Sequence, residues 1–329
     1  MSTKVEVLKP IQTEMAAGPT EQMVGRSTRT VAHWRAPRRT SAKKPTQIAS
    51  AATSPTPAPK PTASKSGELT LVINLQRRPD RIAALEKMKL PFEWTRLDAV
   101  DGRALTWDAL GKSSGHEFAG LVHPDAVREA LWAEKQAMPT ICRSTGSFSP
   151  HLTLGAVGIA LSQRKCWQAL LESGSATDYA LILEDDISSI AADFNAKLKL
   201  IVRTLPSTWC VCFLGFHESS GKLLHPAKPP AVMPVPNGAC LTGLYGYVVS
   251  RRGAKALLAA RALFPLRHQV DVAVSQMPWP KDTRFCVDPN GVLLTSPKSE
   301  EGACDTDIQT LGRQSEKAHA ALPRTMMRL

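Results

Sequence analysis

The chain has 329 residues, a formal net charge of +12 and 43% hydrophobic residues, which is enough for one large domain or two small ones. It contains no apolar run of bilayer length and no apolar core behind basic residues at its N-terminus, so we expect neither a transmembrane segment nor a signal peptide. Its seven scattered cysteines argue against a disulfide framework and favour a reducing compartment, the cytoplasm.

Most of the positive charge lies in residues 1–67, which hold 11 Lys and Arg against 3 Glu and so contribute +8. This segment is rich in Ser, Thr, Pro and Ala, and such a composition predicts a disordered tail because it offers too little apolar surface to bury. The basic residues from Arg35 to Lys44 have one aromatic neighbour, Trp34. We therefore favour a solvated linker and do not expect nucleic-acid binding.

The first ordered elements are a strand over residues 69–75, a helix that ends near Lys89 and a second strand over residues 92–98. This strand–helix–strand order is typical of a nucleotide-binding α/β unit. Three basic side chains follow the first strand: Arg77, Arg78 and Arg81. Their position suits a phosphate or a nucleotide, and it is equally compatible with ordinary solvated charge.

The later elements alternate between helices and buried strands. We expect helices over residues 154–171, 188–205 and 252–263, and strands over residues 179–184, 210–215, 243–250 and 285–288. Residues 219–238 carry five prolines and no period, which predicts a long surface loop. The pattern as a whole indicates an α/β fold.

The most informative stretch is YALILEDDI, residues 179–187, in which an apolar strand runs directly into Glu184, Asp185 and Asp186. Ligands of open α/β sheets bind at the carboxyl ends of the strands. Glu184 and Asp186 are two positions apart and can share one face, where a divalent cation escorting a diphosphate would relieve their repulsion. Alternatively, Asp185 and Asp186 cap the helix expected after them. These residues alone leave both interpretations open.

Several strings occur in an order that resembles glycosyltransferase family 25, which includes lipopolysaccharide galactosyltransferases and collagen hydroxylysine galactosyltransferases. They are VINLQRRPDR (72–81), RLDAVDG (96–102), GAVGIALS (155–162) with Trp167, LILEDDI (181–187), FLG (213–215), YVVSRRG (247–253) and VD (270–271). The resemblance implies a GT-A-like fold, a UDP-sugar donor such as UDP-galactose, Mn²⁺ or Mg²⁺, and a glycan or hydroxylated acceptor. It also implies lipopolysaccharide biosynthesis as one setting.

The resemblance also assigns candidate roles to single residues. The acidic triplet takes the part of a DxD motif, with Asp186 and Glu184 as metal ligands. Donor-binding candidates are Asn74, Arg77, Arg78, Arg81, Asp98, Asp101, Glu184 and Asp185. The implied reaction inverts the sugar and needs a base, for which Asp271 is our candidate, with a helix cap as its alternative role. His268, Asp305 and Asp307 are further candidates for a cation ligand.

The expected organisation is a single GT-A-like domain over residues 68–314, between the tail of residues 1–67 and a loosely ordered end at residues 315–329. Two positions depart from the family pattern, which usually carries Glu and His where this chain has Ala156 and Gln163. The departures are compatible with an altered acceptor pocket, and also with a catalytically inactive member that serves as a binding or scaffold module.

Overall fold

The computed structural model describes residues 68–112, 115–136, 138, 141–142, 147–148, 151–174, 177–218 and 232–297. All of them fall in one compact unit, Ala58–Leu329. The expected tails at residues 1–67 and 315–329 lie outside the described residues, as do Asp305 and Asp307. Within the described part of the chain, no helix combines the length and the apolarity needed to cross a membrane.

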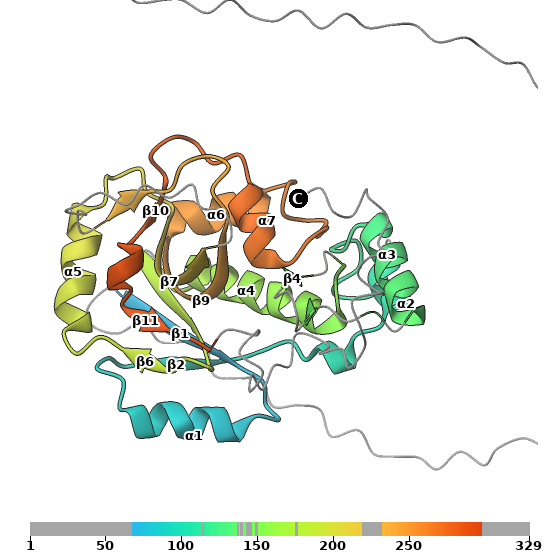
Figure 1. The fold of residues 1–329 in the computed structure, drawn as a ribbon, viewed down its shortest axis with the longest axis horizontal. Coiled ribbons are helices and arrows are strands. Elements are labelled where there is room, and N and C mark those ends of the chain that lie inside the picture. Colours follow the sequence, from blue (N-terminus) through green and yellow to red (C-terminus); the bar gives the residue numbers. More distant parts are fainter. Residues whose placement is uncertain are drawn as a thin grey trace, which may run out of the picture. The chain divides into compact units, whose positions relative to one another are not determined.

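The fold is mixed α/β, as expected, and is built on a seven-stranded sheet (Figure 1). In spatial order its strands are β2 (Thr95–Asp98), β1 (Glu68–Asn74), β5 (Tyr179–Glu184), β9 (Leu241–Ser250), β7 (Val211–Glu218), β10 (Arg284–Cys286) and β8 (Met233–Pro234). β1 runs parallel to β2 and to β5, whereas β9 runs antiparallel to both of its neighbours. β10 is parallel to β7, and β8 closes the sheet in the antiparallel sense.

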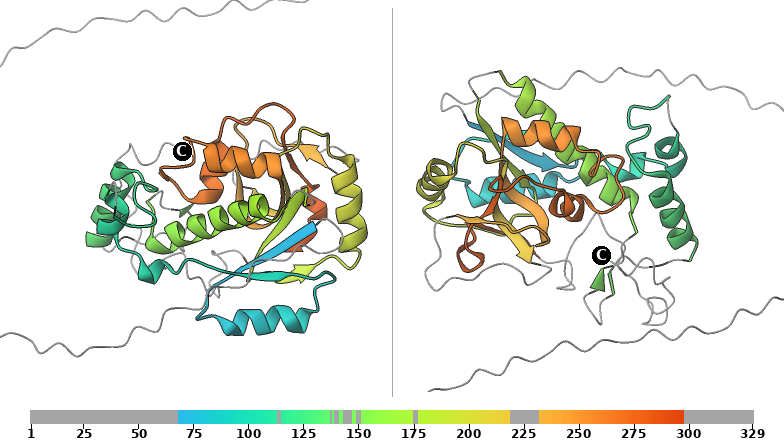
Figure 2. Two further views of the ribbon diagram at one scale, coloured as in Figure 1. Left: turned by 180° about the vertical axis from the view of Figure 1, so that it is seen from behind. Right: turned by 90° about the horizontal axis from the view of Figure 1, so that it is seen from above.

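The helices are α1 (Pro79–Met88), α2 (Trp107–Gly111), α3 (Pro124–Lys135), α4 (Leu154–Glu172), α5 (Phe194–Thr204), α6 (Arg251–Ala259) and α7 (Val270–Gln276), with short 3₁₀ turns at Gly102–Ala104 and Pro289–Gly291. Figure 2 shows α4 and α6 side by side on one face of the sheet. Two small antiparallel pairs complete the described fold: β6 (Ser189–Ile190) with β11 (Leu294–Thr295), and β3 (Ile141–Cys142) with β4 (Ser147–Phe148).

The central strand β5 is buried on both faces, which explains its unbroken apolar sequence. Ala180, Leu181, Ile182 and Leu183 are all 0% exposed. The predicted strand–helix–strand unit is confirmed as β1, α1 and a parallel β2. Cys210 and Cys212 are buried free thiols.

The prediction of a helix over residues 188–205 is wrong for its first third, because α5 begins at Phe194. The backbone N–H of Ser188 donates to the carbonyl of Thr295, and that of Ala191 donates to the carbonyl of Leu293, so this segment pairs with β11 before α5 begins. The N-cap of α5 is Asp193. Asp185 and Asp186 therefore cap no helix, which removes the alternative interpretation of the acidic triplet.

Other differences concern the ends of elements. The strand expected over residues 210–215 continues to Glu218, and the helix expected to reach residue 263 ends at Ala259. The proline-rich region expected as a loop contains β8, whose partner is β10. The longer β7 and the presence of β8 arise from pairing with strands distant in sequence, which local periodicity does not reveal.

Candidate active site

The site forms at the edge of the sheet where β1, β2 and β5 end. Strand register places Asn74 opposite Asp98, and Ile73 opposite Glu184. Because β9 is antiparallel to β5, it begins at this same edge. The first residues of β9 therefore lie beside the carboxyl ends of the parallel strands, where open α/β sheets bind ligands.

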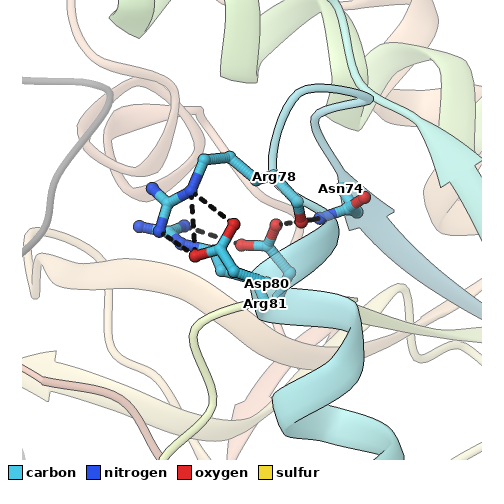
Figure 3. Close-up of polar contacts among 5 residues, drawn as sticks. Asn74, Arg78, Asp80 and Arg81 are labelled. Atoms are coloured by element: carbon cyan, nitrogen blue, oxygen red, sulfur yellow. Dashed lines mark hydrogen bonds and ion pairs between the residues drawn. The ribbon is translucent and has the colours of Figure 1, made fainter.

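Asp185, the middle acid of the triplet, is buried and fully engaged by positive and polar partners. Its Oδ1 forms an ion pair with Arg81 at 2.7 Å, and its Oδ2 accepts a hydrogen bond from Asn74 Nδ2 at 2.6 Å. The same Asn74 nitrogen donates to the carbonyl of Arg78 at 3.0 Å (Figure 3). Asp185 thereby fastens the turn after β5 to β1 and to the start of α1.

The remaining donor-binding candidates lie around this anchor and form ion pairs with one another or with neighbours. Arg77 pairs with Asp101 at 2.9 Å, and Arg78 pairs with the exposed Asp80 at 2.7 Å (Figure 3). Arg96 pairs with Asp98 at 3.1 Å. These charges sit near the edge of the sheet, but their described contacts are not with the acidic triplet.

Glu184 and Asp186 are carboxyl groups whose ionised forms the protein compensates only in part. Burial raises the pKa of Glu184 well above its ordinary value, and Asp186, Asp185 and Asp271 raise it further. Burial also raises the pKa of Asp186, although Arg81 opposes this shift. Asp186 Oδ1 is buried without a hydrogen-bond partner among the described residues. A buried acceptor of this kind is costly unless a ligand satisfies it.

Asp271 reaches the site from the first turn of α7, whose N-cap is Gln269. Gln269, and not Asp271, therefore occupies the N-cap position of α7. Asp271 Oδ2 accepts a hydrogen bond from the backbone N–H of Gly243 at 2.9 Å, and its Oδ1 accepts one from Val272. Gly243 has a φ of +79°, a conformation that favours glycine. Burial raises the pKa of Asp271, while the Gly243 bond lowers it.

Sequence reasoning missed the polar groups that α4 and β9 contribute. Tyr245 is buried near the acids, and its pKa is raised by burial and by the charges of Asp186 and Glu184. Gln163 Nε2 donates to Glu184 Oε1 at 3.4 Å, and Gln163 Oε1 accepts from Tyr247. Gln163 was visible in the sequence only as a departure from the family pattern. Tyr247 appeared in the sequence only as the first residue of the string YVVSRRG, and nothing there pointed to Tyr245.

His268 does not join the site. Burial lowers its pKa, and the charges that act on it belong to Glu129 of α3 and to Arg267. The structure thus brings together Asn74, Arg81, Glu184, Asp185, Asp186 and Asp271. Four other candidates from the sequence form ion pairs elsewhere. Arg77 pairs with Asp101, Arg78 with Asp80, and Asp98 with Arg96.

The carboxylate groups of the site fit a metal ion that takes few of its ligands from the protein. No group of three or more His, Cys, Asp or Glu side chains in the described ranges is arranged to hold a metal ion. Glu184 and Asp186 offer two carboxylates, and the unpartnered Asp186 Oδ1 is an acceptor in need of a positive partner. Mg²⁺ and Mn²⁺ are commonly held by one or two carboxylates together with substrate phosphates and water.

Residues 68–215 match the family model described as Glycosyltransferase family 25 (LPS biosynthesis protein). Over these residues the chain is similar to glycosyltransferase family 25. None of the curated proteins compared with the chain matches it. The family implies a glycosyltransferase, with a sugar donor and an acceptor. The family 25 match includes the acidic triplet and ends inside β7, so Tyr245, Tyr247 and Asp271 lie beyond it.

Proposed function

We propose that this protein transfers a hexose, galactose in the first instance, from a UDP-sugar to a hydroxyl of a glycan or a hydroxylated acceptor. The family match supports the reaction class. The mixed sheet, with acids at the carboxyl ends of its parallel strands, supports a GT-A-like donor site. Lipopolysaccharide assembly is one setting for such a transfer.

The observation that carries this proposal is the pair Glu184 and Asp186, two buried carboxylates whose charge is only partly compensated. We assign them to Mn²⁺ or Mg²⁺, which when bound would stabilise the charge that develops on the departing diphosphate. Asp185 remains tied to Arg81 and keeps the turn in place.

Asn74 is suited to contact the nucleotide. Its amide nitrogen donates to Asp185 and to the carbonyl of Arg78, which fixes the orientation of the amide group. Its Oδ1 is then left buried without a partner among the described residues. An N–H of the base or an O–H of the ribose would satisfy it. We assign Arg77 and Arg78 to the diphosphate, whose oxygens would replace their present carboxylate partners, Asp101 and Asp80.

Asp271 is our candidate for the base of an inverting transfer, which must accept the proton of the attacking hydroxyl. Burial raises the pKa of its carboxyl and so strengthens it as a base, and the Gly243 bond fixes its position. Its side chain lies close enough to Glu184 to raise the pKa of that carboxyl. Base and donor site are therefore neighbours.

The substitution Asp186→Asn tests the function, because it keeps the size of the side chain and removes its charge. We expect Mn²⁺-dependent release of UDP from UDP-galactose to fall by about a hundredfold or more, with folding retained. Asp193→Asn is the control, since Asp193 is exposed and pairs with Lys197. Unchanged turnover in the Asp186 variant would refute the cation site.

A second candidate function is a non-catalytic binding or scaffold module. Ala156 and Gln163 motivate it, because they replace an acid and an imidazole of the family pattern. Calorimetric titration with UDP and Mn²⁺ separates the two. Absence of binding favours the scaffold, whereas binding followed by acceptor-dependent release of UDP excludes it.

A further inference from the structure

A chain of buried hydrogen bonds links α4 to the acidic triplet through β9. Trp167 Nε1 donates to the hydroxyl of Tyr247 at 2.8 Å, and that hydroxyl donates to Gln163 Oε1 at 2.7 Å. Gln163 Nε2 lies 3.4 Å from Glu184 Oε1 and 3.4 Å from the carbonyl oxygen of Leu244. Trp167 and Gln163 are 0% exposed and Tyr247 is 1% exposed, so water does not compete for these bonds.

The chain has a fixed direction. An indole N–H can only donate, so the Tyr247 oxygen accepts from Trp167 and directs its own hydrogen to Gln163. The Gln163 oxygen is thereby occupied, and the amide nitrogen must face Glu184 and the Leu244 carbonyl. Asparagine and glutamine amides are often ambiguous in orientation, but here the hydrogen-bond network decides it.

We propose that Gln163 is the positioning residue of Glu184, and that Trp167 and Tyr247 lock it in that role. Glu184 Oε1 is held by the protein, which directs the carboxylate into the donor site for Mn²⁺ or Mg²⁺ and the diphosphate. This inference rests on the proposed function and adds to it a residue that does not itself touch the donor. Groups that orient metal-binding carboxylates commonly change affinity as strongly as some ligands do.

A double-mutant cycle tests the link without any ligand. Gln163→Met and Glu184→Met remove the two partners with little change in size, and chemical denaturation gives the unfolding equilibrium constant of each variant. We expect the change in the unfolding constant caused by Gln163→Met to differ by about tenfold between the wild-type and the Glu184→Met backgrounds. Ser162→Ala is the control, because its buried hydroxyl bonds Gly158 and Val100 instead. Its effect should be independent of Glu184 to within about twofold.

Calorimetry with UDP and Mn²⁺ then tests positioning. We expect Gln163→Met to weaken binding by about tenfold, and Ser162→Ala to leave it unchanged. Tyr247→Phe is a second variant, which keeps the amide but removes the group that orients it. It should weaken binding to a smaller extent, and it serves as the test if Gln163→Met does not fold.

The outcomes separate the two proposals. Absence of coupling between Gln163 and Glu184, or unchanged binding of UDP and Mn²⁺ in the folded variants, would overturn the positioning role while leaving the proposed function intact. A wild-type protein that binds neither UDP nor Mn²⁺ would overturn the proposed function, and the positioning role with it.

Discussion

Neighbouring acids in the triplet have different environments. Asp185 is neutralised by Arg81 and hydrogen-bonded to Asn74, so it acts as an anchor. Glu184 and Asp186 flank it without equivalent compensation. Asp185 thus has a structural role, and we assign Glu184 and Asp186 to the proposed cation. Without a cation, the ionised forms of these two buried carboxyls oppose folding.

The pH dependence of stability should expose this cost at Glu184. The pKa of its carboxyl is raised in the folded state, so its contribution to stability falls as pH rises from the ordinary value of 4.5. We expect Glu184→Gln to increase the free energy of unfolding at pH 8 by at least about 1 kcal/mol, and by less at pH 5. Urea denaturation at the two pH values measures it.

Two outcomes sharpen this measurement. The exposed Glu172 at the end of α4 offers a control, because Glu172→Gln should change stability equally little at both pH values. A Glu184 variant that is less stable than the wild type at pH 8 would contradict the charge assignment. Adding Mn²⁺ and UDP should stabilise the wild type but not the Glu184 variant.

Two arginines at the start of α1, Arg78 and Arg81, give a second prediction at this scale. Arg81→Gln leaves the buried Asp185 without its cation and should lower the free energy of unfolding by about 3 kcal/mol. Arg78→Gln is the matched variant, since its partner Asp80 is 61% exposed, and we expect a clearly smaller loss of stability. Equal losses in urea denaturation would show that Asp185 is not the anchor.

At the scale of elements, the sequence predicted buried strands better than pairings. The apolar run before Glu184 identified β5 because a strand covered on both faces needs no alternation. The two-residue strands β6 and β8 carry no period of their own and exist through β11 and β10. For the same reason the position of the acids at the end of β5 was predictable, whereas the contacts of Gln163 and Asp271 with β9 were not.

The close approach of α6 to the sheet provides a test of this packing. A Cβ added at Gly253 would lie 2.1 Å from the carbonyl oxygen of Cys210, a backbone atom that cannot move freely. Gly253→Ala should therefore lower the free energy of unfolding by about 2–3 kcal/mol. Gly111, at the end of α2, is the control, because a Cβ there meets nothing nearer than 3.9 Å.

Thermal unfolding of both glycine variants decides the matter. Gly111→Ala should be neutral or stabilising by up to about 1 kcal/mol, because alanine favours the helix. A Gly253→Ala protein with the melting temperature of the wild type would mean that α6 can shift away from β7 without cost.

For the whole molecule, the sheet is completed by a strand from outside the family 25 match. β9 lies between β5 and β7, although it follows both in the chain and lies beyond residue 215. A protein of residues 68–215 would leave β5 and β7 as bare, apolar edges. We expect it to lack a cooperative unfolding transition and near-ultraviolet circular dichroism, whereas residues 68–329 should show both. Cooperative unfolding of the short chain would contradict this topology.

The tyrosine content has a practical consequence. The chain has only three tyrosines, Tyr179, Tyr245 and Tyr247. Tyr245 and Tyr247 lie in β9 beside the acids, whereas Tyr179 lies at the opposite end of β5. Incorporation of fluorotyrosine should therefore give a fluorine NMR spectrum of three resonances, two that respond to nucleotide or metal and one internal reference. Candidate donors could then be screened without an acceptor in hand.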